Sequence, residues 1–260
     1  MPGSDLALLI EAAQEAGRIA TAFVGGPLDM QDKPGGAGPV TAADLAVNAM
    51  LVKQLRAARP DYGWLSEETE DTAARLGAER VFIVDPIDGT RSFIEGNDSW
   101  AHSLAVVERG VVIAAAIYLP MRDKLYTAAA GQGATLNGVP IHATARADLE
   151  GASILAAKPN YAPEHWQGGR VPEVTRAFRP SLAYRLSLVA EGRYDAMMTL
   201  RPSWEWDIAA GDLILREAGA TTSDRRARPL LFNNPVPMVN GVLAANPVLH
   251  SALHAALVQG

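Results

Sequence analysis

The feature that most constrains this chain is an apolar run that ends in two closely spaced acids. Val81–Val84 has the length and composition of a buried strand, and it leads directly into Asp85–Thr90, which reads Asp-Pro-Ile-Asp-Gly-Thr. Two buried carboxylates repel each other and resist the loss of water unless a cation lies between them. Oxygen-only ligands favour Mg²⁺, Mn²⁺ or Ca²⁺. The order of residues therefore predicts a divalent metal site, and the competing interpretation is a surface Asp-Pro turn followed by an Asp-Gly turn.

Composition argues against several other classes of protein. The 260 residues are 48% apolar and 20% charged, as in a typical globular chain, and the net charge of −6 argues against a general nucleic-acid binder. The chain has no cysteine, so it forms neither a disulfide nor a thiolate metal site. We find no signal peptide and no apolar run near the ~20 residues of a membrane helix. We expect a cytoplasmic protein that acts on a small phosphorylated metabolite, with no nucleic-acid polymer and no membrane as partner.

Hydrophobic periodicity predicts an α/β protein in two parts. Residues 1–148 form an α+β part, in which two amphipathic helices, the second beginning after Thr41, precede strands from 80 to about 141. The first of these strands covers 80–85, and two later strands are expected to form a hairpin about Arg109 and Gly110. A segment rich in glycine and proline, 29–40, separates these helices and predicts a loop. Residues 149–260 alternate between strands and helices, which indicates an α/β layer with helices over 181–191, 207–218 and 247–258.

Further acids can join Asp85 and Asp88. Glu67 ends a short predicted strand, and Asp207 begins a predicted helix. One shared site explains these acids more simply than several unrelated surface positions do. In such a site Asp85 can bridge two metal ions and Asp88 can hold one of them, and the Ile87 carbonyl can supply a further oxygen.

The residues beside these ligands suit the hydrolysis of a phosphate ester. Two metal ions roughly 3.5–4 Å apart would clamp a phosphate and lower the pKa of a bound water. Glu67 together with Thr90 could orient that water and accept its proton. Gly89 lets the backbone approach a phosphate closely, and the amides of Gly89 and Thr90 could bind the phosphate oxygens. The pattern predicts a metal-dependent phosphatase.

Three motifs resemble the signatures of the inositol monophosphatase superfamily. They are Glu67-Glu68, the run Asp85–Thr90, and Trp206–Gly211, which reads Trp-Asp-Ile-Ala-Ala-Gly. The similarity extends over nearly the whole chain. It implies a layered α-β-α-β-α sugar-phosphatase fold and lithium-sensitive hydrolysis of phosphomonoesters with two or three Mg²⁺ ions, usually in a homodimer. It also implies two ligand sets, one of Glu67, Asp85 and the Ile87 carbonyl, the other of Asp85, Asp88 and Asp207.

The resemblance gives roles to four residues around these ligands. Glu67 with Thr90 matches the pair that activates water. Lys33 matches a lysine on a mobile loop, and Asp44 matches an acid at a helix start near the metals. Taken without the resemblance, Asp44 could equally be an ordinary favourable charge at a helix N-terminus.

The stretch before Asp207 is the best guide to the substrate. Inositol monophosphatases typically carry a glutamate seven residues before this aspartate, and here that position is Leu200. The sequence Arg201-Pro-Ser203 is instead similar to the Gly-Pro-Thr of 3'(2'),5'-bisphosphate nucleotidases. Arg201 could bind a second phosphate or, with equal weight, pair with a surface acid. Ser203 and Arg185 are further candidates for substrate contact.

These features favour removal of the 3'-phosphate from 3'-phosphoadenosine 5'-phosphate. The alternative within the same chemistry is inositol 1-phosphate, followed by fructose 1,6-bisphosphate. A non-catalytic, metal-dependent regulator of the same fold is the alternative from another class. Every acid that the metal sites require is present, which favours an enzyme.

Overall fold

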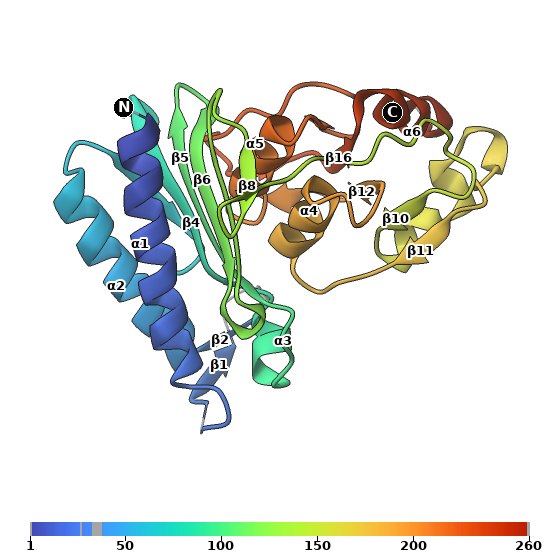
Figure 1. Cartoon of the computed structure of the whole chain (residues 1–260). Coiled ribbons are helices and arrows are strands. Elements are labelled where there is room, and N and C mark those ends of the chain that lie inside the picture. Colours follow the sequence, from blue (N-terminus) through green and yellow to red (C-terminus); the bar gives the residue numbers. More distant parts are fainter. Residues whose placement is uncertain (1, 27, 33–37, 259–260) are drawn as a thin grey trace.

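The computed structural model describes residues 2–26, 28–32 and 38–258, and its elements stack in five layers (Figure 1). Helices α1 (Pro2–Thr21) and α2 (Ala42–Ala58) cover one face of a seven-stranded sheet. Helices α4 (Leu182–Ala190) and α5 (Ala209–Glu217) lie between this sheet and a second one, whose outer face α6 (Pro247–Ala256) covers. This order confirms the expected layered α-β-α-β-α fold.

The larger sheet contains seven strands in the order of the sequence. The first two strands pair in parallel, and every later pair is antiparallel. The predicted hairpin around Arg109 and Gly110 is confirmed as the pair β5 and β6. The strands are β3 (Gly63–Ser66), β4 (Arg80–Asp88), β5 (Ala101–Glu108), β6 (Val111–Leu119), β7 (Lys124–Ala129), β8 (Ala134–Leu136) and β9 (Val139–Pro140).

Strand β4 continues past its predicted end at Asp85, because the next residues form a bulge and not a turn. Its register with β5 shifts between Asp85, which pairs with Ser103, and Asp88, which pairs with Ala101. The bulge therefore inserts one extra residue into β4. In a regular strand residues three apart face opposite sides of the sheet. The extra residue turns Asp88 to the same face as Asp85, the face covered by α4 and α5.

The second sheet has five strands in the order β11-β10-β12-β16-β14. Its parallel part is β11 (Thr175–Ala177), β10 (Ser153–Leu155) and β12 (Ala196–Thr199); its antiparallel part adds β16 (Val242–Ala245) and β14 (Thr221–Ser223). A two-stranded pair, β13 (Ser203–Trp204) and β15 (Met238–Val239), lies beside the segment that leads to α5. One apolar cluster includes residues of both larger sheets and of α4 and α5. The division into 1–148 and 149–260 stays a prediction.

The expectation of a loop over 29–40 is wrong where the structure describes this segment. Strand β1 (Met30–Asp32) pairs with β2 (Pro39–Thr41), which leads directly into α2. Most of the glycine and proline residues, at 34–36 and 38, come between the two strands in the sequence. Pro39 is the first residue of β2, a position at which a strand tolerates proline. Thr41 caps α2 as predicted, and its amide donates to the Asp44 carboxylate at 2.8 Å. Lys33 lies outside the described residues.

Apolar clusters hold the layers together. One fills the space between α1, α2 and the larger sheet, and another lies between the second sheet and α6. Among the helices just described, none combines the length and apolar character required to cross a lipid bilayer.

Candidate metal and phosphate site

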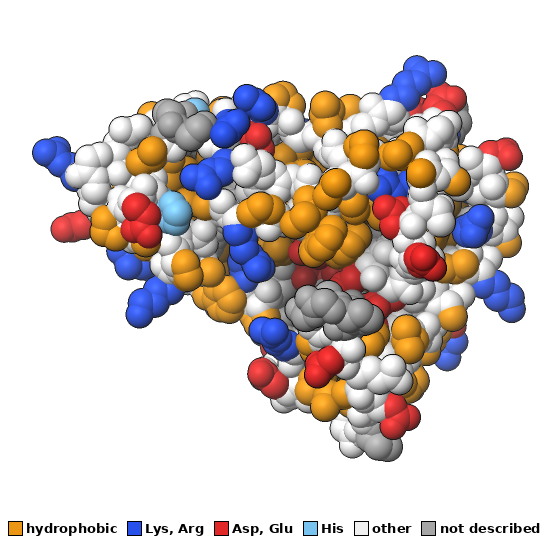
Figure 2. Space-filling view, turned by 180° about the vertical axis from the view of Figure 1, so that it is seen from behind, with side chains coloured by type: hydrophobic (Ala, Val, Ile, Leu, Met, Phe, Trp, Pro, Cys, Tyr) orange, Lys and Arg blue, Asp and Glu red, His pale blue; other side chains and the backbone are white. Residues whose placement is uncertain are grey.

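A cavity of about 880 Å³ lies where β4 ends. Its walls come from the β4 bulge, the short helix α3 (Thr90–Ile94), the N-terminal end of α4 and the segments 157–165 and 199–207. Acidic side chains gather in a hollow near the centre of this face of the molecule, and basic side chains lie close by (Figure 2). The cavity thus combines a buried acidic floor with a partly cationic wall.

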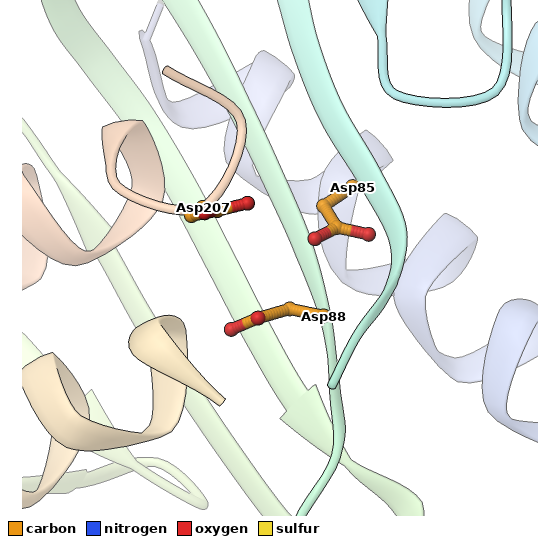
Figure 3. A group of neighbouring side chains, drawn as sticks. All are labelled: Asp85, Asp88 and Asp207. Atoms are coloured by element: carbon orange, nitrogen blue, oxygen red, sulfur yellow. The ribbon is translucent and has the colours of Figure 1, made fainter. Parts of the chain in front are cut away.

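Three carboxylates converge on the cavity floor (Figure 3). Asp85, Asp88 and Asp207 each place an oxygen within 4.8 Å of the others. The first two come from the β4 bulge, and Asp207 lies in the turn that precedes α5. The Ser103 hydroxyl on β5 donates to the Trp206 carbonyl at 2.9 Å, which ties this turn to the strand beside β4. Backbone geometry therefore brings two distant sequence motifs to one point.

The electrostatics of this cluster fit a divalent cation. Loss of water on burial, followed by repulsion from neighbouring acids, raises the pKa of Asp85 and of Asp207 well above the usual range. Burial also raises the pKa of Asp88 to about 6. A hard cation would remove this repulsion, and the donor set consists of oxygen atoms only, as Mg²⁺ prefers. The residues present therefore fit the metal that the sequence predicts.

Asp88 is held by the first turn of α4. Its Oδ2 accepts hydrogen bonds from the Ser181 hydroxyl and the Ala183 amide, each at 2.6 Å. The Ser181 oxygen in turn accepts from the Tyr184 amide at 2.9 Å and so caps the helix. Oδ1 of Asp88 has no hydrogen-bond donor among the described residues and is available to a cation. Sequence reasoning missed this role of Ser181, although a serine before a predicted helix is a recognisable cap.

The Ile87 carbonyl, Thr90 and Asp44 lie together at one edge of the cluster. The Ile87 side chain is buried in the core beneath α1 and α2, whereas its carbonyl accepts a hydrogen bond from the Thr90 hydroxyl at 3.2 Å. The same hydroxyl lies 3.4 Å from Oδ1 of Asp44. The structure thus places a backbone oxygen, a hydroxyl and a further acid beside the three converging carboxylates.

Glu67 and Gly89 line the same cavity. Glu67 follows β3 directly, and its negative charge is the strongest of the neighbouring charges that raise the pKa of Asp85. Its carboxylate is not one of the three that meet within 4.8 Å. Gly89 has a φ of +98°, and a Cβ at this position would lie 3.3 Å from the Ser99 carbonyl oxygen. A side chain there would be strained, so glycine suits the turn between β4 and α3.

Arg185 lies on the cavity wall but is already engaged. It is buried, its guanidinium donates to the carbonyls of residues 179 and 180, and it stacks 4.3 Å from the centroid of the Phe178 ring. Burial lowers its pKa to about 10, while Asp88 and Asp207 favour its charged form. Arg185 therefore balances the acids from a fixed position.

Arg201 and Ser203 differ in how they meet the cavity. Arg201 lines it, is exposed, and its guanidinium forms no hydrogen bond with any residue in the described part of the chain. Ser203 is buried, does not line the cavity, and donates its hydroxyl to the Arg201 carbonyl at 3.3 Å. Of these two candidates for substrate contact, Arg201 therefore lines the cavity and Ser203 does not.

Several lining residues carry no motif that sequence reasoning could use. They come from segments that the second sheet brings together, so only the tertiary structure reveals them. Trp204 had a local signal, since it lies three residues before Asp207 in a Trp-Glu-Trp-Asp run. The residues missed on this wall are Asn160, His165, Phe178, Thr199 and Trp204.

Comparison with known proteins decides the family. The model of the inositol monophosphatase family matches residues 4–260. The chain belongs to the inositol monophosphatase family. An inositol-1-monophosphatase of Mesorhizobium japonicum is 32% identical over 262 residues, covering 95% of this chain and 94% of the relative. The Nus factor SuhB of Salmonella typhimurium is 31% identical over 260 residues, covering 95% and 93%. The crystal structure of the extragenic suppressor protein suhB from Bartonella henselae superimposes with a TM-score of 0.83 at 30% identity, covering 99% of both chains.

Family membership confirms the predicted reaction class. This member of the inositol monophosphatase family is a phosphatase with an acidic metal site, and its family depends on a divalent metal. The finer resemblance to bisphosphate nucleotidases finds no support in the relatives named above, which are an inositol monophosphatase and SuhB proteins. The comparisons favour the inositol phosphate alternative.

Proposed function

We propose that this phosphatase hydrolyses the phosphomonoester of a small polyol, with inositol 1-phosphate as the first substrate to test. The observation that carries the proposal is the convergence of three carboxylates on one cavity, in a chain 32% identical to an inositol-1-monophosphatase over 95% of its length. When bound, two or three Mg²⁺ ions would neutralise phosphate charge and lower the pKa of a water molecule. Asp85, Asp88 and Asp207 would hold these ions together with Glu67 and the Ile87 carbonyl.

The remaining residues of the site would orient the reactants. Thr90, held beside Asp44 and the Ile87 carbonyl, would position the attacking water, and Glu67 would accept its proton. The amides of Gly89 and Thr90 would donate to oxygens of the phosphate. Because the water, the phosphate and the proton acceptor are fixed on rigid elements, little reorganisation is required during the reaction.

A specific observation favours a second substrate, 3'-phosphoadenosine 5'-phosphate. The cavity wall formed by residues 157–204 includes no acid that could hold polyol hydroxyls, and Leu200 lies on it. The wall instead presents the guanidinium of Arg201 and the ring of Trp204, which is 40% exposed and stacks on Trp206 with 4.7 Å between centroids. A guanidinium suits a second phosphate, and an aromatic ring suits a planar base.

A panel of substrates tests both proposals. We would measure phosphate release from inositol 1-phosphate, 3'-phosphoadenosine 5'-phosphate and fructose 1,6-bisphosphate, with Mg²⁺ and with EDTA. A kcat/KM that is highest for inositol 1-phosphate supports the main proposal, and one that is highest for the bisphosphate nucleotide supports the second. Absence of Mg²⁺-dependent release from all three would overturn both.

One variant tests whether the cationic wall of the cavity binds a second phosphate. Arg201→Ala should raise the KM for the bisphosphate nucleotide about 10-fold or more, the amount expected when a charged hydrogen bond is lost, and change the KM for inositol 1-phosphate much less. Arg226→Ala, on an exposed turn, is the matched control. Equal effects of Arg201→Ala on both substrates would exclude contact with a second phosphate. Lithium inhibition, a homodimer, a cytoplasmic location and the lack of a nucleic-acid partner stay predictions.

A further inference from the structure

One buried histidine lies opposite the β4 bulge. His102 occupies the β5 position between Ser103 and Ala101, the partners of Asp85 and Asp88. Its side chain is 0% exposed, and its Nδ1 is hydrogen-bonded to the Pro86 carbonyl within the bulge. No motif discussed above includes this residue.

The hydrogen bond fixes which nitrogen carries the proton. A carbonyl oxygen only accepts, so Nδ1 of His102 must be the donor. Burial lowers the pKa of the ring to about 4, so the imidazole is neutral near pH 7 and has a single N–H. Nε2 has no partner among the described residues, as expected for the nitrogen without a proton. Trp100 packs against the ring with 5.5 Å between centroids and restricts its orientation.

The peptide between Pro86 and Ile87 is therefore held at both of its polar ends. Its carbonyl accepts from His102, and its N–H donates to Oδ1 of Asp85 at 2.9 Å. Because a peptide unit is planar, fixing the carbonyl also fixes the direction of the N–H. The N–H in turn fixes one oxygen of the Asp85 carboxylate. His102 is thus connected to a metal-binding carboxylate through one rigid group.

We propose that His102 is a positioning residue, which orients Asp85 for a divalent cation through the peptide between Pro86 and Ile87. The inference rests on the proposed metal site and adds a residue to it. Partners that orient metal ligands typically contribute about 10–100-fold to metal affinity. His102 does not line the cavity, and its hydrogen bond reaches Asp85 through the peptide between Pro86 and Ile87.

Two variants distinguish a positioning role of the His102 side chain from a role in packing alone. Asn places an amide donor where Nδ1 of histidine lies, whereas Val removes the donor and keeps an apolar side chain suited to a strand. We expect His102→Val to weaken Mg²⁺ binding about 10-fold or more and His102→Asn to restore most of the affinity. The measurement is isothermal titration of Mg²⁺ into the metal-free full chain, together with its thermal midpoint.

A second buried histidine supplies the control. His250 on α6 is 5% exposed and is hydrogen-bonded through Nε2 to the Ser223 hydroxyl at 2.7 Å, outside the cavity. His250→Val should lower the thermal midpoint without changing Mg²⁺ affinity. The comparison distinguishes a general loss of stability from a local effect on the metal site.

The outcomes separate the inference from the proposed function. Mg²⁺ affinity of His102→Val equal to that of the wild-type chain would overturn the positioning role alone, whereas a wild-type chain that binds no Mg²⁺ would overturn the metal site itself. If His102→Val does not fold, His102→Gln replaces it, since glutamine places its donor near Nε2 and not near Nδ1. Weak Mg²⁺ binding by the Gln variant beside normal binding by the Asn variant supports the inference, and equal binding by the two refutes it.

Discussion

Asp88→Asn should stabilise the metal-free protein while it abolishes Mg²⁺-dependent turnover. Burial raises the pKa of Asp88 to about 6 in the folded chain, whereas an aspartate in an unfolded chain titrates near 3.9. The unprotonated carboxylate is therefore less favourable in the folded state than in the unfolded state. The stability that the protonated group contributes below about pH 4 is lost as the pH rises through about 6.

The size of the expected stabilisation follows from the difference between the pKa values of Asp88 in the folded and unfolded chain. About 2 pKa units at about 1.4 kcal/mol each correspond to about 3 kcal/mol of lost stability at pH 7.5. Asparagine keeps the shape of the side chain, so its carbonyl oxygen can accept the bonds that Ser181 and Ala183 donate at 2.6 Å. Its amide would face Asp85 and Asp207 as a donor. We expect a gain of about 2–3 kcal/mol in the free energy of unfolding at pH 7.5, and almost none at pH 4.

Urea unfolding in EDTA, followed by circular dichroism at pH 7.5 and pH 4, measures this gain. Asp195→Asn is the matched control, because it should change the free energy of unfolding in the opposite direction. Burial favours a higher pKa for Asp195, but hydrogen bonds from Ser153 and Thr144 keep this pKa below its usual value. The asparagine variant should therefore lose stability at pH 7.5. An Asp88→Asn protein that is less stable than the wild type at pH 7.5, or equally stabilised at both pH values, would refute the reasoning. Near-normal turnover would refute the ligand assignment.

Three further predictions concern the competition of protons with Mg²⁺, the cap of α4 and the packing of α5 on α4. Mg²⁺ should raise the thermal midpoint less at pH 5 than at pH 7.5, because a proton competes with the metal for Asp88, whose pKa is about 6. An equal rise at both pH values would contradict this prediction. Ser181→Ala should cost about 1–2 kcal/mol and weaken Mg²⁺ binding in a titration, since it removes a helix cap and a donor to Asp88; unchanged affinity would limit Ser181 to capping. Gly211→Ala should cost about 1–3 kcal/mol in urea unfolding, because its Cβ would lie 2.5 Å from the Leu186 side chain, whereas Gly77→Ala, with open space around it, should not; equal effects would contradict the contact.

Local sequence signals predicted those parts of the fold that local physics controls. Thr41 and Asp44 form the cap that begins α2, and the apolar strands on either side of Arg109 and Gly110 form the expected hairpin. Caps and turns depend on a few adjacent residues, so one sequence contains enough information to recognise them. The loop expected over 29–40 was wrong because composition alone cannot distinguish two short paired strands separated by a glycine-rich sequence from an irregular loop.

The geometry of the acid cluster could not be predicted from spacing. Asp85 and Asp88 are three residues apart, a separation that places side chains on opposite faces of a regular strand. Only the register with β5 shows that one extra residue brings them to the same face. His102 follows Asp88 by fourteen positions, and nothing in the sequence connects it with Pro86. The burial of Ser203 was equally inaccessible, and in the structure this residue does not line the cavity and donates its hydroxyl to the Arg201 carbonyl.

The contrast between local motifs and tertiary packing explains why the reaction class is easier to predict than the substrate. The three converging carboxylates come from two short motifs, each fixed by its own backbone. The opposite wall comes from residues 157–165, 178–185 and 199–204, which meet only because the second sheet packs against α4 and α5. Leu200 illustrates the consequence. It occupies the position at which inositol monophosphatases typically carry a glutamate, yet it is 5% exposed and packs in the core beneath α6. A missing acid can be read from one sequence, but the groups that replace it must be found in the packed structure.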